Sequence, residues 1–116
     1  MLMYPIDELV KPCRMSPHMA EGVGAFTTRV VAKGVKVYAT WPNVFHHPEY
    51  DANPQVAANL VAIRGFWEKL GIPVLGEPSG AWFDAKYMYD TSYHLNREGV
   101  AIRTRKFADV LEAIIP

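Results

Sequence analysis

Apolar residues recur at helical spacing in two stretches of the chain, and these stretches predict its most clearly marked elements. From 54 to 70 an apolar side chain returns every three or four residues, which gives a helix one apolar face. Asn53 precedes this stretch as an N-cap, and Gly71 ends it. From 97 to 114 the pattern repeats behind Asn96, which is again a good N-cap. The apolar positions of the two helices are Val56, Leu60, Ile63, Trp67 and Leu70, and Val100, Phe107, Val110, Leu111 and Ile114.

Local signals predict one further helix and two short strands. Ser16 and Pro17 mark the start of a helix that ends at about Lys33, because Gly34 provides a C-terminal stop. Two stretches rich in β-branched and aromatic residues read as strands. The predicted strands are residues 35–41 and 72–75, and the stretches without a regular period are 1–16, 42–52 and 81–95.

The predicted elements follow the order helix, strand, helix, strand, loop, helix. Strands that are separated by helices of this length pair in parallel through right-handed crossovers. We therefore expect an α/β fold in which a parallel sheet carries flanking helices. Two strands make a thin sheet, so we expect a partial or truncated layered structure. It forms a single domain over 1–116, with an irregular segment at 1–16 and the α/β part over 17–116.

Composition and charge narrow the class of protein. The chain has 116 residues, of which 50% are hydrophobic and 12% aromatic, so it fits one domain with a core rather than a disordered segment. Twelve basic residues balance twelve acidic ones, which removes any overall attraction to nucleic acid. No apolar run is long enough to span a bilayer, and the first residues lack the apolar stretch of a signal peptide. We expect a soluble domain, and the sequence does not indicate its cellular compartment.

One cysteine, Cys13, excludes an internal disulfide and a cysteine-cluster metal site. His46 and His47, with Glu49 and Asp51 nearby, raise the question of a metal site. Adjacent side chains diverge in most backbones, and no second ligand cluster has partner spacing. The prediction is a solvated loop, no metal and no cofactor.

The segment from 89 to 99 carries the most informative chemistry. Asp90 and His94 are close enough in sequence for the carboxylate to hold one imidazole nitrogen, which fixes the tautomer and leaves the other nitrogen as a base. A structural or incidental pair is the alternative, and Asp84 is the next carboxylate to consider. The segment follows a predicted strand, and ligands of parallel α/β sheets gather at the carboxyl ends of strands.

This segment resembles the final sequence block of the SGNH (GDSL-like) hydrolase superfamily. In that block a His is followed by Pro or Leu, then Asn, two variable residues and Gly, as in His94-Leu95-Asn96-Arg97-Glu98-Gly99. Residues 40–43 resemble the Pro-terminated end of the family's late strand, and residues 70–75 resemble the helix end and strand that follow it. The similarity is closest to branches that act on cell-envelope polymers. The resemblance implies a flavodoxin-like layered fold and a Ser-His-Asp triad, with His94 as base and Asp90 as acid. It further implies O-acyl or O-acetyl esters, including those on envelope polysaccharide, as substrates.

Two features depart from the family pattern. Three residues separate Asp90 from His94, whereas the more familiar spacing is two. The Gly-Asp-Ser nucleophile block and the oxyanion-hole Gly and Asn blocks are missing, and the serines at 16, 79 and 92 do not follow a strand. The chain therefore resembles the C-terminal half of an esterase or acyltransferase and is expected to be inactive alone. The alternatives are a non-catalytic interaction module and an unrelated small α/β binding domain.

Other polar and aromatic residues each have two interpretations. Asn43 follows a predicted strand and is a candidate substrate-binding residue, or simply forms a turn. Tyr93 is a further candidate for substrate binding. It belongs to a set of aromatic residues that form either a substrate-binding wall or core and interface packing. The others are Trp41, Trp82, Tyr87 and Tyr89. The basic residues of the last helix are expected on a solvated face, and they are Arg97, Arg103, Arg105 and Lys106.

Self-association is the remaining expectation. A thin sheet leaves an unpaired strand edge, and such edges are templates for another chain. The apolar helix faces exceed what one small sheet buries, and a net charge near zero offers little repulsion. We expect a homodimer or higher oligomer. The alternative is a monomer in which residues 1–16 fold back over the exposed edge.

Overall fold

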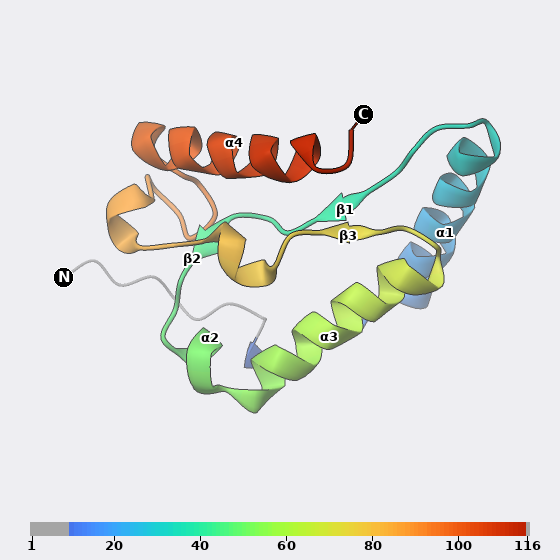
Figure 1. Ribbon diagram of the computed structural model, residues 1–116. Coiled ribbons are helices and arrows are strands. Elements are labelled where there is room, and N and C mark those ends of the chain that lie inside the picture. Colours follow the sequence, from blue (N-terminus) through green and yellow to red (C-terminus); the bar gives the residue numbers. More distant parts are fainter. Residues whose placement is uncertain (1–9, 116) are drawn as a thin grey trace.

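The computed structural model describes residues 10–115 as short strands between four helices (Figure 1). Helix α4 lies on one side of the β1 and β3 strands, α3 crosses on the other side, and α1 stands beyond the far end of α3 in this view. Two 3-10 turns, η2 and η3, separate the later strands from α4. In chain order the elements are α1 Pro17–Ala32, β1 Ala39–Thr40, β2 Val44–Phe45, α2 Glu49–Ala52, α3 Pro54–Lys69, β3 Val74–Leu75, η2 Pro78–Ala81, β4 Trp82–Phe83, η3 Ala85–Tyr87 and α4 Arg97–Glu112.

Helices α1 and α3 begin and end where their capping residues predict, and α4 begins after Asn96 as expected but ends at Glu112, before the predicted end at 114. Ser16 Oγ accepts a hydrogen bond from the Met19 amide at the start of α1 (3.5 Å). Asn53 Oδ1 accepts from the Gln55 amide at the start of α3 (2.9 Å). Gly34 and Gly71, which follow α1 and α3, have φ angles of 83° and 73°. That left-handed conformation favours glycine, so both residues end their helices as expected.

The strands pair in parallel, as predicted, but they are much shorter than expected. Ala39 pairs with Val74, and Val44 pairs with Trp82, in two separate two-stranded sheets. The prediction of one strand over 35–41 is therefore wrong in extent, because its partner β3 contributes two residues and begins after Pro73, which has no amide to donate. The η2 turn lies between β3 and β4, and the segment between their partners β1 and β2 has no such turn. The extra residues prevent the two strand pairs from joining into one continuous ladder.

Two stretches without a sequence period contain regular structure. Residues 42–52, predicted as a polar loop, include β2 and α2, and residues 81–95 include β4 and η3. Val44 and Tyr50 from the first stretch are buried against Val56 of α3. The supposed loop is therefore part of the core.

The core is small for a chain of this size. Nine hydrophobic residues are buried among the described residues, and of these Val56 alone has no exposed surface. The radius of gyration is 15.6 Å, whereas a compact chain of this length has about 13 Å. The architecture is thus α/β in the coarse sense, with small parallel sheets and without substantial sheet layers. In the described part of the chain, no helix combines the length and the apolar character needed to cross a membrane.

Candidate active site

The segment between η3 and α4 forms a tight, hydrogen-bonded turn. The Tyr89 amide donates to the His94 carbonyl (2.7 Å), and the Asn96 amide donates to the Tyr87 carbonyl (2.8 Å). At the tip, Thr91 Oγ1 accepts from the amides of Tyr93 and His94 (both 3.2 Å). Side-chain and backbone bonds together therefore fix the conformation in which Asp90 and His94 are presented.

Asp90 and His94 form a hydrogen-bonded pair within this turn. Asp90 Oδ1 lies 2.8 Å from His94 Nδ1, which confirms the expected contact and leaves no need to invoke Asp84 as the partner. A carboxylate at Nδ1 favours the tautomer in which Nδ1 carries the proton and Nε2 carries the lone pair. His94 Nε2 makes no hydrogen bond with any described residue, and the side chain is 65% exposed. The geometry suits a base that acts on an incoming group.

The residues after His94 explain why this sequence forms the turn. Asn96 Oδ1 caps α4 by accepting from the Gly99 amide (2.9 Å), and Asn96 Nδ2 donates to the Lys86 carbonyl (2.6 Å). Gly99 is buried, and a Cβ atom there would lie 2.6 Å from the Tyr87 carbonyl oxygen. A side chain at this position would separate α4 from η3. Asn96 and Gly99 therefore position the turn that carries His94.

The segment after β1 is bonded directly to the turn. Asn43 Nδ2 donates to the Tyr93 carbonyl (2.5 Å), and the Phe45 amide donates to the Ser92 carbonyl (2.7 Å). The structure thus brings together the four candidate residues, which are Asn43, Asp90, Tyr93 and His94. One N–H group of the Asn43 side chain is already bonded to the turn. Asn43 Oδ1 makes no hydrogen bond within the described residues, and Tyr93 is 48% exposed. Their role in substrate binding remains a prediction.

The three serines of the chain lie among the described residues, and none of them is bonded to His94 there. Ser16 caps α1, Ser79 lies in η2, and Ser92 contributes its backbone carbonyl to the contact with β2. Within residues 10–115, no hydrogen bond joins a serine hydroxyl to His94. Within the described residues, the Asp90–His94 pair therefore stands without a bonded serine hydroxyl.

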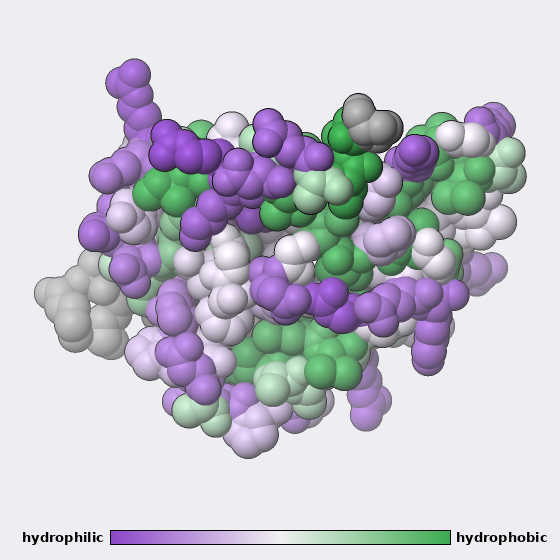
Figure 2. All heavy atoms as spheres, in the orientation of Figure 1, coloured by the Kyte–Doolittle hydropathy of each residue, from purple (hydrophilic) through white to green (hydrophobic). Residues whose placement is uncertain are grey.

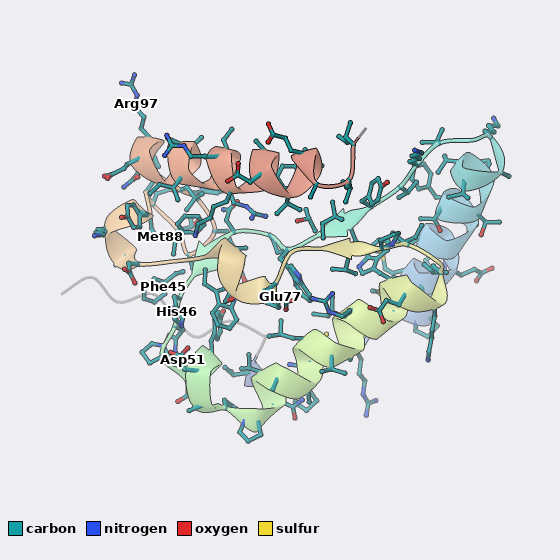
Figure 3. The ribbon with its side chains drawn as sticks, viewed as in Figure 1. Phe45, His46, Asp51, Glu77, Met88 and Arg97 are labelled. Atoms are coloured by element: carbon teal, nitrogen blue, oxygen red, sulfur yellow. The ribbon has the colours of Figure 1, made fainter. Side chains whose placement is uncertain are left out.

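A second His–Asp pair lies between β2 and α2 and was not predicted from the sequence. His46 Nε2 is 2.9 Å from Asp51 Oδ1, and the His46 ring lies 5.0 Å from the ring of Trp82 (Figure 3). His47 Nδ1 accepts from the Glu49 amide (3.2 Å). The expected solvated loop is a folded corner instead. Among the described residues, no group of three or more His, Cys, Asp or Glu side chains is arranged to hold a metal ion.

Several candidates for a substrate-binding wall or a solvated face have structural roles. Trp41 is buried, and its Nε1 donates to the Gly76 carbonyl (3.2 Å). Arg103, expected on a solvated face of α4, donates from a terminal nitrogen to the Trp41 carbonyl (2.7 Å), and burial lowers the pKa of its guanidinium. By contrast, Tyr89 is 74% exposed beside Asp90. Tyr89 and Tyr93 are thus exposed aromatic residues that adjoin Asp90 and His94 in the sequence.

Comparison of the chain with protein-family models, with curated proteins and with solved structures found no match. The geometry of the turn and the sequence that forms it are therefore the features that bear on function.

Proposed function

We propose that this chain is the C-terminal portion of an SGNH-like esterase or acyltransferase, with His94 as general base and Asp90 as its orienting acid. The observation that carries the proposal is the 2.8 Å contact between Asp90 Oδ1 and His94 Nδ1, with Nε2 left without a partner among the described residues. The fold is consistent with the proposal at the coarse level of parallel strands flanked by helices. The substrate class is an O-acyl ester on a small molecule or a polysaccharide.

The proposed chemistry assigns each residue a step. A serine supplied from outside this chain attacks the ester carbonyl while His94 Nε2 takes the hydroxyl proton. The resulting imidazolium then protonates the leaving alcohol, and water or an acceptor alcohol releases the acyl group by the reverse sequence. Asp90 holds the ring and stabilises its charged form through Nδ1. No cofactor takes part.

The first prediction is that the chain alone does not turn over esters. A His–Asp pair without a nucleophile and oxyanion donors cannot form or stabilise an acyl intermediate. With p-nitrophenyl acetate, release of p-nitrophenol should rise linearly with substrate, at the slow rate of free imidazole. Saturable hydrolysis that Ser16→Ala or Ser92→Ala abolishes would place the nucleophile within this chain and refute the proposal.

A second candidate function, a self-associating interaction module, is favoured by the amount of apolar surface left exposed. Figure 2 shows apolar patches that reach the surface over the first half of α3 and near the end of α1. Val61 on α3 is 72% exposed, and Phe26 and Val31 on α1 are 53% and 48% exposed. The expanded radius of gyration agrees with helices that lack a full set of packing partners.

The second prediction is that the chain forms a homodimer or a higher oligomer at micromolar concentration. Exposed apolar side chains and unpaired strand edges favour association, and a formal net charge of zero opposes it little. Sedimentation velocity is the measurement. Val61→Asp should shift the distribution toward the monomer, and Glu68→Asp, an exposed change on the same helix that keeps the charge, should leave it unchanged. A wild-type chain that sediments as a monomer and does not bind a hydrophobic dye would contradict the prediction.

A further inference from the structure

A pocket of about 270 Å³ lies between α4 and the carboxyl ends of β1 and β3. We call it the α4 pocket, and it is distinct from the candidate active site because none of Asn43, Asp90, Tyr93 and His94 lines it. Carboxyl ends of parallel strands are where ligands of α/β proteins gather. The lining residues used below are Trp41, Glu77, Arg103, Lys106, Phe107 and Asp109.

Two cations of α4 line this pocket without a carboxylate partner. Arg103 lies with its guanidinium 5.6 Å from the centre of the Phe107 ring, and Lys106 Nζ lies 5.5 Å from the centre of the Phe83 ring. Within residues 10–115 neither cation forms an ion pair. Arg103 is half-buried, and a charge removed from water without a counterion is costly. An anion in the pocket would remove that cost.

The acidic residues of the lining do not cancel these charges. Glu77 is already paired with Arg64, at 3.4 Å from oxygen to nitrogen. Asp109 is exposed and forms no ion pair with a described residue, and Lys106 is exposed with its ammonium over Phe83, which does not line the pocket. Arg103 is therefore the half-buried cation of the lining, which favours a ligand with a single negative charge. The remaining walls are mostly apolar and include Phe107 and Val110.

We propose that the α4 pocket binds a small organic acid, with its carboxylate against Arg103 and its apolar part against Phe107 and Val110, and that the exposed Lys106 side chain turns from Phe83 toward the bound carboxylate. An arginine presents fixed donors that match a carboxylate, and Arg103 uses one terminal nitrogen on the Trp41 carbonyl. The pocket volume suits a ligand of the size of an aromatic acid rather than a nucleotide. The assignment does not depend on the esterase function.

The test is a titration with benzoate at constant ionic strength, followed by the indole N–H resonance of Trp41. Benzoate should shift that resonance to a plateau, because Trp41 lines the pocket and bonds both Gly76 and Arg103. Benzyl alcohol, which has the ring without the charge, should not. Phenyl phosphate, which carries a second negative charge, should bind no more tightly than benzoate.

Variants of α4 separate the pocket from general charge effects. Arg103→Gln should weaken benzoate binding about tenfold, and Lys106→Gln about threefold. Arg105→Gln removes the same charge from an exposed neighbour that does not line the pocket, and should change the affinity less than Lys106→Gln. Comparison of these last two variants decides the question even if Arg103→Gln fails to fold.

The proposal is overturned if benzoate gives no plateau, if benzyl alcohol binds as well as benzoate, or if Arg105→Gln weakens binding as much as Lys106→Gln. His94→Gln should leave benzoate binding unchanged, so the α4 pocket and the esterase proposal can fail independently.

Discussion

Replacement of His94 by Gln is expected to lower ester hydrolysis by about a thousandfold or more in a protein that joins this chain to a segment carrying the nucleophile. Glutamine keeps the size of the side chain but cannot accept the serine proton as a base. Asp90→Asn should cost about a hundredfold or more, because the amide no longer holds the ring in the tautomer with a free Nε2. The measurement is kcat/KM for an O-acyl ester.

The second His–Asp pair supplies a matched control. His46→Gln removes an imidazole that is bonded to Asp51 of α2 at 2.9 Å. The neighbouring Phe45 amide bonds the turn, but the His46 ring is not bonded to Asp90 or His94. It should leave kcat/KM within about twofold of the wild-type value. If His94→Gln keeps full activity, or if His46→Gln costs as much, then the base is misassigned.

Gly99→Ala is expected to destabilise the chain by about 1–3 kcal/mol and to displace the turn that carries His94. The new Cβ would lie 2.6 Å from the Tyr87 carbonyl oxygen, which is a backbone atom and also accepts the Asn96 amide. The clash therefore has no flexible side chain to relieve it, and α4 must move away from η3. Chemical denaturation measures the free energy of unfolding, and NMR of the Asp90 and His94 resonances reports the displacement.

Gly65→Ala provides a control that is expected to raise the free energy of unfolding instead of lowering it. Gly65 lies inside α3, and a Cβ there meets no atom within 4 Å. Alanine in an open helical position should stabilise the chain by about 0.5–1 kcal/mol. If Gly99→Ala unfolds at the same denaturant concentration as the wild type, the close approach of α4 and η3 is not what positions the turn.

Helix boundaries were predictable because each depends on residues that are neighbours in the sequence. Asn53 and Asn96 cap their own helices, and Gly34 and Gly71 take the left-handed conformation that ends a helix. The strands were predicted less well, since a strand extends only as far as its partner. The partner of Ala39 is Val74, far along the chain, and its length could not be inferred from residues 35–41.

In the candidate site, too, contacts between sequence neighbours were predictable and contacts between distant segments were not. The Asp90–His94 contact was predictable because the two residues are four apart and lie in a string that resembles a known block. The burial of Tyr50 and the pairing of β2 with β4 were missed, since both depend on contacts with segments distant in sequence. Arg103 was expected in solvent because helical periodicity distinguishes apolar positions from polar ones. It cannot reveal that a polar side chain reaches a hydrogen-bond acceptor far away in the sequence, as Arg103 reaches the Trp41 carbonyl.

The most direct test of the central claim is to label the full product of the gene with a fluorophosphonate and to identify the modified residue by mass spectrometry. The claim that this chain supplies the base and the acid, and not the nucleophile, predicts a labelled serine outside residues 1–116, in a Gly-Asp-Ser sequence, with labelling lost in His94→Gln. Label on Ser16, Ser79 or Ser92, or labelling that His94→Gln leaves intact, would contradict it, as would the absence of any label.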